Sequence, residues 1–127
     1  MKFGDRFPLT KEKFTIGRDE DNDIVINEPR VSRKHAQIIR KGDNFILKDM
    51  DSSNGTFANL RAVKEYILNN GDVISLGGFG IANFQFERED DKDEAVLVVL
   101  EKVLREGEES PVRKTVRVDK DKLYDEL

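Results

Sequence analysis

Residues 36–47 read AQIIRKGDNFIL, in which a turn at Lys41–Asn44 separates the apolar runs Ala36–Ile39 and Phe45–Leu47. Glycine, aspartate and asparagine are the residues that tight turns favour, because they tolerate backbone conformations closed to most side chains. Each apolar run is only a few residues long, which suits a strand better than a helix. The segment therefore predicts a β-hairpin.

The same alternation of short apolar runs and turn residues extends over residues 13–87. The further runs are Phe14–Ile16, Ile24–Ile26, Val73–Leu76 and Ile81–Phe86. In the last run, Phe84 and Phe86 alternate with polar residues, as expected for a strand with one buried face. A second tight hairpin turn is predicted at Asn69–Asp72. Short strands at this spacing, without crossover helices between them, predict an all-β antiparallel sandwich.

The composition excludes most kinds of catalytic site. The chain has 127 residues, which is enough for one domain with a hydrophobic core. It has no cysteine, and its one histidine, His35, leaves too few ligands for most metal sites. The sequence shows neither a paired-carboxylate pattern nor a nucleotide-binding glycine loop. We therefore expect a protein that is not an enzyme and uses no metal or cofactor.

The charged residues are unevenly distributed. Basic and acidic side chains balance over residues 1–87, so the net charge of −4 comes from residues 88–127. A chain without a broad basic face is a poor match for nucleic acid. There is no apolar run long enough to span a membrane, and Met1–Asp5 lacks the apolar segment of a signal peptide. The expected compartment is the cytoplasm.

The end of the chain differs from the rest. Residues 87–94 form a charge run that predicts a solvated linker, and the apolar run Ala95–Leu104 follows. The leucines of this run have helical spacing, whereas its β-branched valines also fit a strand. We favour a short helix. This divides the chain into a domain at residues 1–87 and a linker with a tail element at residues 88–127.

Three polar segments fall in predicted turns. Gly17-Arg18 follows the apolar run Phe14–Ile16. Residues 32–36 (SRKHA) lead into the hairpin of residues 36–47, and residues 51–57 (DSSNGTF) follow that hairpin. Turns at one end of a sandwich can gather such side chains around a small anion. The planar fork of Arg18 can pair bidentately with a phosphate.

The other polar side chains of these turns suit the same ligand. The Ser32 hydroxyl can donate to a phosphate, and Arg33 or Lys34 can add a second positive charge. The Asn54 amide can donate and accept, so it can hold an extended peptide backbone. Surface ion pairing of Arg18 and ordinary turn chemistry at Ser32 and Asn54 are the alternatives. Together the side chains indicate a phosphorylated residue on a strand-like peptide.

The ordered combination of these motifs resembles the forkhead-associated (FHA) domain family. The resemblance rests on Gly17-Arg18, on residues 32–36, on residues 52–57 and on the sequence NGDVISLG at residues 70–77. It implies a β-sandwich that binds phosphothreonine in partner proteins during Ser/Thr-kinase signalling, without catalysis. The family prefers phosphothreonine to phosphoserine, with the threonine methyl group in a small pocket between the loops.

The resemblance also implies roles for individual residues. Arg18 and Ser32 would bind the phosphate, and Arg33 and Ser53 would support it from the neighbouring loops. Asn54 would bind the peptide backbone on either side of the phosphothreonine. A phosphothreonine-containing protein is therefore the expected partner.

Four further residues complete the implied site. Asn59 would contact peptide residues after the phosphothreonine, although Leu60 follows it here where the family usually has glycine. His35 would brace the loop that presents the ligand side chains. Gly17 and Gly55 would permit backbone conformations that a side chain blocks.

Two features bear on assembly and specificity. The segment Met1–Asp5 is short for the family's first strand, and a sandwich that lacks an edge strand exposes unpaired backbone groups. Ala95–Leu100 is a candidate for that place, either within the chain or from a second copy. A homodimer through the tail, with an unused phosphate site, is thus the alternative function. The charge of Arg30 predicts a preference for an acidic residue a few positions after the phosphothreonine.

Overall fold

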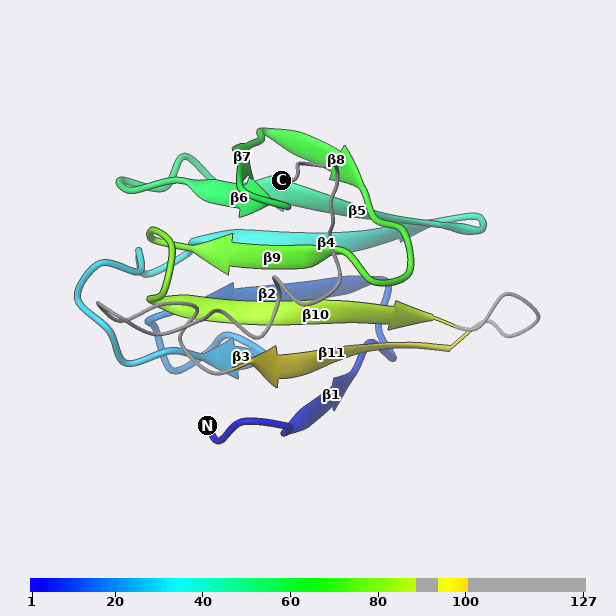
Figure 1. Cartoon of the computed structure of the whole chain (residues 1–127), viewed down its shortest axis with the longest axis horizontal. Coiled ribbons are helices and arrows are strands. Elements are labelled where there is room, and N and C mark those ends of the chain that lie inside the picture. Colours follow the sequence, from blue (N-terminus) through cyan, green and yellow to red (C-terminus); the bar gives the residue numbers. More distant parts are fainter. Residues whose placement is uncertain (89–93, 101–127) are drawn as a thin grey trace, which may run out of the picture.

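The computed structural model describes residues 1–88 and 94–100, which form two β-sheets packed face to face (Figure 1). The six-stranded sheet has the order β1 (Arg6–Pro8), β11 (Ala95–Leu100), β10 (Ala82–Arg88), β9 (Val73–Leu76), β6 (Thr56–Ala58) and β7 (Arg61–Ala62). The five-stranded sheet has the order β3 (Ile24–Val25), β2 (Lys13–Gly17), β4 (Ala36–Lys41), β5 (Asn44–Asp49) and β8 (Glu65–Ile67). The β2–β3 pair is parallel and the other pairs are antiparallel.

The all-β prediction is confirmed for the described residues, which contain no helix and hence none long and apolar enough to cross a membrane. The hairpin predicted at residues 36–47 is β4–β5, closed by the Lys41–Asn44 pair, and Gly42 at its tip has a positive φ of 59°. The prediction of a hairpin at Asn69–Asp72 is wrong. This turn joins β8 to β9, which belong to different sheets. A local turn signal shows where the chain reverses, but it does not determine which strands pair.

The preference for a helix after residue 94 is also wrong over Ala95–Leu100, which is strand β11. Its residues alternate between buried and half-buried, as a strand of the sandwich requires. It pairs with β10 on one side and with β1 on the other. The boundary expected at Glu87 therefore does not separate this strand from the sandwich, and β11 has no free edge for a second copy. Residues 101–107 lie outside the described residues.

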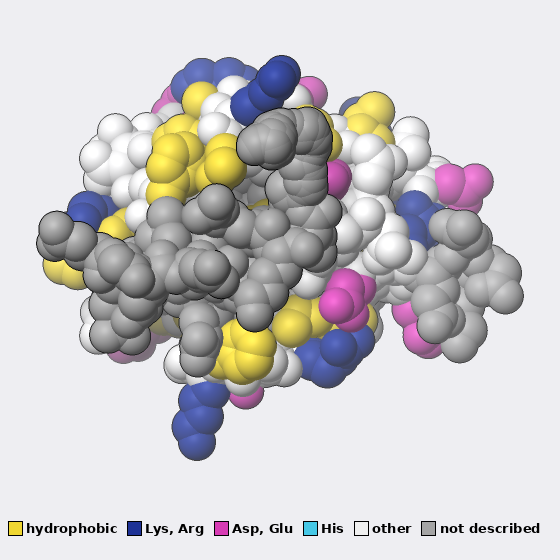
Figure 2. All heavy atoms as spheres, in the orientation of Figure 1, with side chains coloured by type: hydrophobic (Ala, Val, Ile, Leu, Met, Phe, Trp, Pro, Cys, Tyr) yellow, Lys and Arg dark blue, Asp and Glu magenta, His cyan; other side chains and the backbone are white. Residues whose placement is uncertain are grey.

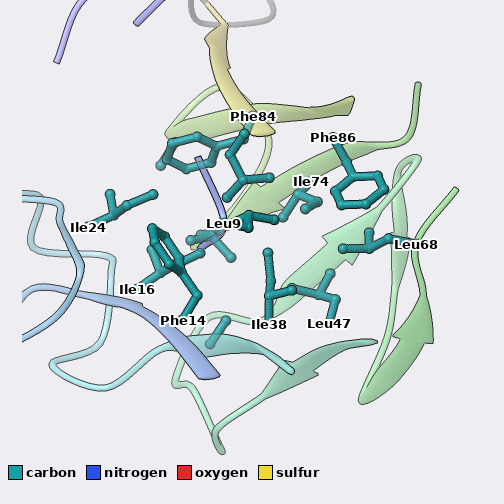
Figure 3. Close-up of a cluster of buried hydrophobic side chains, with 14 of the residues drawn as sticks. Leu9, Phe14, Ile16, Ile24, Ile38, Leu47, Leu68, Ile74, Phe84 and Phe86 are labelled. Atoms are coloured by element: carbon teal, nitrogen blue, oxygen red, sulfur yellow. The ribbon is translucent and has the colours of Figure 1, made fainter. Parts of the chain in front are cut away.

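Apolar side chains from both sheets fill the space between them (Figure 3). Phe84 and Phe86 of β10 point into this core, as their alternation with polar residues predicts. Phe45 of the opposite sheet packs against Phe86, with ring centroids 5.5 Å apart and a tilt of 56°. Burial of these large side chains holds the two sheets together.

One end of the sandwich collects the segments with polar motifs. The strands β2 and β5 end there at Gly17 and Asp49, and β4 and β6 begin there at Ala36 and Thr56 (left in Figure 1). Antiparallel pairing places the end of one strand beside the start of the next. Three loops, distant in sequence, therefore meet at this end.

Candidate functional site

We define the site loops as residues 18–23, 26–35 and 50–55, which join β2 to β3, β3 to β4 and β5 to β6. Backbone and side-chain hydrogen bonds tie the three loops together. The Arg18 amide donates to the Ser32 carbonyl at 3.0 Å, and the Asp19 amide to the Arg33 carbonyl at 3.2 Å. The Ser53 amide donates to the Ser32 Oγ at 3.0 Å. The second loop is thus bonded to both of the others.

Arg18 is exposed at the start of the first site loop. Its Nε donates to the Val31 carbonyl at 2.9 Å, which fixes the plane of the guanidinium. The two terminal nitrogens make no hydrogen bond or ion pair with the described residues and remain open to a ligand. A side chain held in this way loses less conformational entropy when it binds an anion.

Ser32 and Ser53 lie next to each other in space although they are far apart in the chain. The Ser32 Oγ uses a lone pair to accept from the Ser53 amide, so its own hydroxyl hydrogen is available to a ligand. Both serines belong to loops that begin or end at buried strand residues. The pair therefore offers donors from two loops within one small area.

His35 is fully buried and connects the second and third site loops. The Ser32 amide donates to its Nδ1 at 2.9 Å, and its Nε2 lies 2.8 Å from the Gly55 carbonyl oxygen. Because an amide can only donate, Nδ1 must accept, so the proton is on Nε2 and the ring is neutral. Burial lowers the pKa of His35, although the Gly55 carbonyl and the Asp49 carboxylate oppose this shift. The implied bracing role fits this geometry.

Asp49 organises the third site loop from the end of β5. Its Oδ1 accepts from the Ser52 hydroxyl at 2.5 Å and from the Thr56 hydroxyl at 2.6 Å. The Ser52 hydroxyl in turn accepts from the Gly55 amide at 3.0 Å. Burial raises the pKa of Asp49, but these hydrogen bonds outweigh it and the net pKa is lowered. Sequence reasoning missed Asp49, although an aspartate before a Ser-rich turn is a recognised turn signal.

Gly17 and Asn22 hold the first loop against the second. A Cβ on Gly17 would lie 2.2 Å from the Arg33 carbonyl oxygen, so only glycine fits here. The buried Asn22 amide donates to that same oxygen at 2.8 Å and to the Asp19 carbonyl at 2.9 Å. Asn22 was not expected in the site, because its partners are backbone atoms that no sequence motif identifies.

Asn54 is exposed at the tip of the third loop. Its Nδ2 donates to the Arg30 carbonyl at 2.9 Å, which leaves the side-chain carbonyl oxygen free to accept from a peptide. The following residue, Gly55, has a φ of 96°, in the region that favours glycine. The positive φ of Gly55 suits the expected backbone role, and the peptide contact of Asn54 stays a prediction.

Asn59 lies outside the three site loops. It lies beyond β6, and its amide nitrogen donates to Asp72 at 2.9 Å. Its amide oxygen accepts from the Val73 amide, also at 2.9 Å, at the start of β9. Both ends of the side chain are thus engaged inside the domain. Asn59 thus links β6 to β9, and the peptide contact expected of it stays a prediction.

The basic side chains around the site differ in how they are engaged. The Arg33 guanidinium is exposed and makes no hydrogen bond or ion pair within the described part of the chain. Lys34 pairs with Asp21 at 2.5 Å, and Arg30 pairs with Glu28 at 3.3 Å. Arg33 and Arg18 are therefore the basic groups with the most freedom to bind an anion.

In residues 1–88 and 94–100, no group of three or more His, Cys, Asp or Glu side chains is placed to hold a metal ion. What the site loops offer instead is a cluster of hydrogen-bond donors. The guanidinium of Arg18 and the hydroxyl hydrogen of Ser32 belong to loops that hydrogen bonds join at one end of the sandwich. Donors of this kind suit an anion with several oxygen atoms.

The sequence and the fold were compared with known proteins. The family model of the FHA domain matches residues 14–77, about half of the chain. An oxoglutarate dehydrogenase inhibitor of Corynebacterium jeikeium is 41% identical over 76 residues, which cover 60% of this chain and 53% of that protein. The glycogen accumulation regulator GarA of Mycolicibacterium smegmatis is 35% identical over 88 residues, which cover 69% of this chain and 56% of GarA. The chain thus spans about half the length of these relatives.

A solved structure also resembles this fold. Mycobacterium tuberculosis EmbR in complex with a low affinity phosphopeptide is 30% identical, with a TM-score of 0.54. The similarity covers 80% of this chain and 23% of the EmbR chain. The likeness therefore concerns one domain of a longer protein.

Proposed function

We propose that this chain, which belongs to the FHA domain family, is a non-catalytic module that binds phosphothreonine in partner proteins and so acts in Ser/Thr-kinase signalling. The observation that carries the proposal is the position of Arg18. Its Nε is fixed on the Val31 carbonyl at 2.9 Å, one residue before Ser32, while its terminal nitrogens are open. A prepared fork next to a hydroxyl donor matches the oxygens of a phosphate.

The phosphate would be bound by groups from all three site loops. Arg18 would donate two parallel hydrogen bonds, and Ser32 would donate its hydroxyl hydrogen. Arg33 would add positive charge, and Ser53 would add a hydroxyl from the third loop. Hydrogen bonds to a charged group contribute about 1.5–3 kcal/mol each. An unphosphorylated peptide would leave these donors without an acceptor.

The peptide backbone would lie along the third loop. The free carbonyl oxygen of Asn54 would accept from a peptide amide beside the phosphothreonine. Two or three charged hydrogen bonds supply about 3–9 kcal/mol, and the backbone contacts of the peptide add to this against the cost of ordering it, so we expect a Kd in the micromolar range. The EmbR structure, which resembles this chain, holds a phosphopeptide. Because phosphorylation needs ATP and a kinase, we place the protein in the cytoplasm.

A titration by fluorescence anisotropy tests the proposal. Peptides of degenerate sequence would carry phosphothreonine, phosphoserine or threonine at the centre. Saturable binding is expected for phosphothreonine, weaker binding for phosphoserine and none for threonine. Arg18→Ala should abolish the binding, whereas Arg61→Ala, an exposed arginine on β7, should not change it. Equal affinity for the phosphothreonine and threonine peptides would reject the proposal.

A further inference from the structure

A row of three isoleucines crosses the outer face of the five-stranded sheet. Ile39 of β4 is the partner of Ile46 in β5, and Ile46 is the partner of Ile67 in β8. Side chains alternate between the two faces of a strand, and the neighbours Ile38 and Leu47 point into the core. The three side chains, which we call the isoleucine row, therefore point away from the sandwich.

Contacts within the described chain leave part of this row exposed. Ile39 and Ile46 are half-buried, and Ile67 is 52% exposed. None of the three belongs to the hydrophobic core formed by the described residues. Cross-strand contact between β-branched side chains stabilises the sheet, but it does not require an exposed isoleucine on the edge strand β8. Apolar side chains that adjoin on a surface, unlike scattered ones, indicate a contact with another molecule.

Three lysines surround the isoleucine row. Lys13 of β2 pairs with Ile39 and so lies at one end of the row. Lys41 of β4 and Lys48 of β5 each lie two residues from the row along their strands, on the same face. None of the three lysines forms an ion pair with a described residue. Their charges are therefore available to a binding partner.

Carboxylates are scarce on this face. Glu65 of β8 is the one acidic residue among the outward positions of the five strands. Elsewhere the charges are mixed, and Figure 2 shows basic side chains next to acidic ones at several places on the surface. The isoleucine row thus lies in a locally positive surface of a domain whose charges balance over residues 1–87.

We propose that the isoleucine row and its lysines bind an amphipathic helix of a partner protein, whose apolar stripe is flanked by aspartate or glutamate. The row crosses two interstrand spacings, about 10 Å. Apolar residues at i, i+4 and i+7 of a helix span about the same length. Carboxylates beside the stripe meet the lysines, whereas a second copy of this chain would bring its own lysines against them.

This surface is separate from the candidate phosphate site. The site loops meet where β2 ends at Gly17 and β4 begins at Ala36. Lys13 lies at the opposite end of β2, and Ile39 lies about 10 Å along β4 from Ala36. A helix can therefore bind while a phosphopeptide occupies the loops, and the inference does not depend on the proposed function.

Three labelled helical peptides of about 18 residues test the proposal in fluorescence anisotropy titrations of the full chain. The acidic peptide carries a leucine stripe flanked by glutamates. The basic peptide has lysines in place of the glutamates, and the third peptide has serines in place of the leucines. The chain should bind the acidic peptide saturably, the basic peptide at least about fivefold more weakly and the serine peptide not at all.

Substitutions locate the binding surface. Ile67→Ser should weaken binding of the acidic peptide about fivefold, because about half of the isoleucine surface remains to be buried. Phe79→Ser is the matched control, since Phe79 is also 52% exposed but lies between β9 and β10 of the other sheet. Lys13→Glu should weaken binding of the acidic peptide and strengthen that of the basic one. Lys2→Glu, which reverses an exposed charge before β1, should change neither.

Several results would overturn the proposal. They are an absence of saturable binding up to about 1 mM peptide, an equal affinity for the acidic and basic peptides, and an affinity that Ile67→Ser leaves unchanged. A dimer in light scattering that Ile67→Ser dissociates would assign the face to a second copy. Binding to phosphatidylglycerol vesicles that Ile67→Ser abolishes would assign it to a membrane. If circular dichroism shows that Ile67→Ser does not fold, the opposite effects of Lys13→Glu on the two charged peptides decide.

Discussion

Replacement of His35 by alanine tests how the site loops are held. The imidazole is fully buried and makes a hydrogen bond to each of two loops, through the Ser32 amide at 2.9 Å and the Gly55 carbonyl at 2.8 Å. Alanine removes both partners at once. It leaves one backbone donor and one backbone acceptor buried without a partner, and it opens a cavity the size of the lost ring.

The magnitude follows from these losses. A buried polar group without a partner costs about 1–3 kcal/mol, and two are created. The cavity adds about 1 kcal/mol if the loops collapse partly into it. The sum, after partial relaxation and hydration, is about 3–5 kcal/mol. For a domain whose total stability is about 5–15 kcal/mol, such a loss is severe.

Urea denaturation at neutral pH, followed by circular dichroism, measures this loss. The matched control is Lys34→Ala, which removes an exposed neighbour whose ion pair with Asp21 lies on the surface and should cost less than about 1 kcal/mol. A His35→Ala variant within about 1 kcal/mol of the wild type would refute the reasoning. It would mean that the imidazole does not connect the loops in solution.

Three further predictions follow. Acidification from about pH 7 to about pH 5.5 should lower the free energy of unfolding, because burial lowers the pKa of His35 in the folded state and the unfolded chain then binds the extra proton. The slope should approach about 1.4 kcal/mol per pH unit in urea titrations, and its persistence in His35→Gln would contradict this cause. Gly17→Ala should cost about 1–3 kcal/mol in thermal melts, since its Cβ would lie 2.2 Å from the Arg33 carbonyl oxygen. Gly42→Ala, with no atom within 4 Å of its Cβ, should cost only the strain of its positive φ, about 1 kcal/mol, and equal losses would contradict the steric argument. A chain that ends at residue 93 lacks β11 and should melt at a markedly lower temperature, whereas an unchanged melting temperature would show that β11 adds nothing to the core.

The strands could be predicted from the sequence because burial leaves a local signature. The alternation around Phe84 and Phe86 is a direct record of which face of β10 meets the core. Strand β11 was harder to predict, because the spacing of its leucines favours a helix whereas its β-branched valines favour a strand. What decides between them is the pairing with β10 and β1, and these partners are distant in the sequence or separated by a charge run. Local patterns carry no information about such contacts.

The candidate site could be predicted from the sequence only in part. Arg18, Ser32 and Asn54 could be identified because their turn motifs occur in a recognisable order. The carboxylate of Asp49 and the amide of Asn22 could not, since they act through backbone and hydroxyl groups that only folding brings near. Function is therefore easier to read from exposed ligand groups than from the buried groups that position them.

An amide NMR titration with a phosphothreonine peptide tests the central claim most directly. The account predicts saturable shifts concentrated in residues 18–23, 26–35 and 50–55, the largest at Arg18, Ser32 and Ser53 and none with the unphosphorylated peptide. Shifts that fall mainly outside these three loops, or that are the same with and without the phosphate, would contradict it.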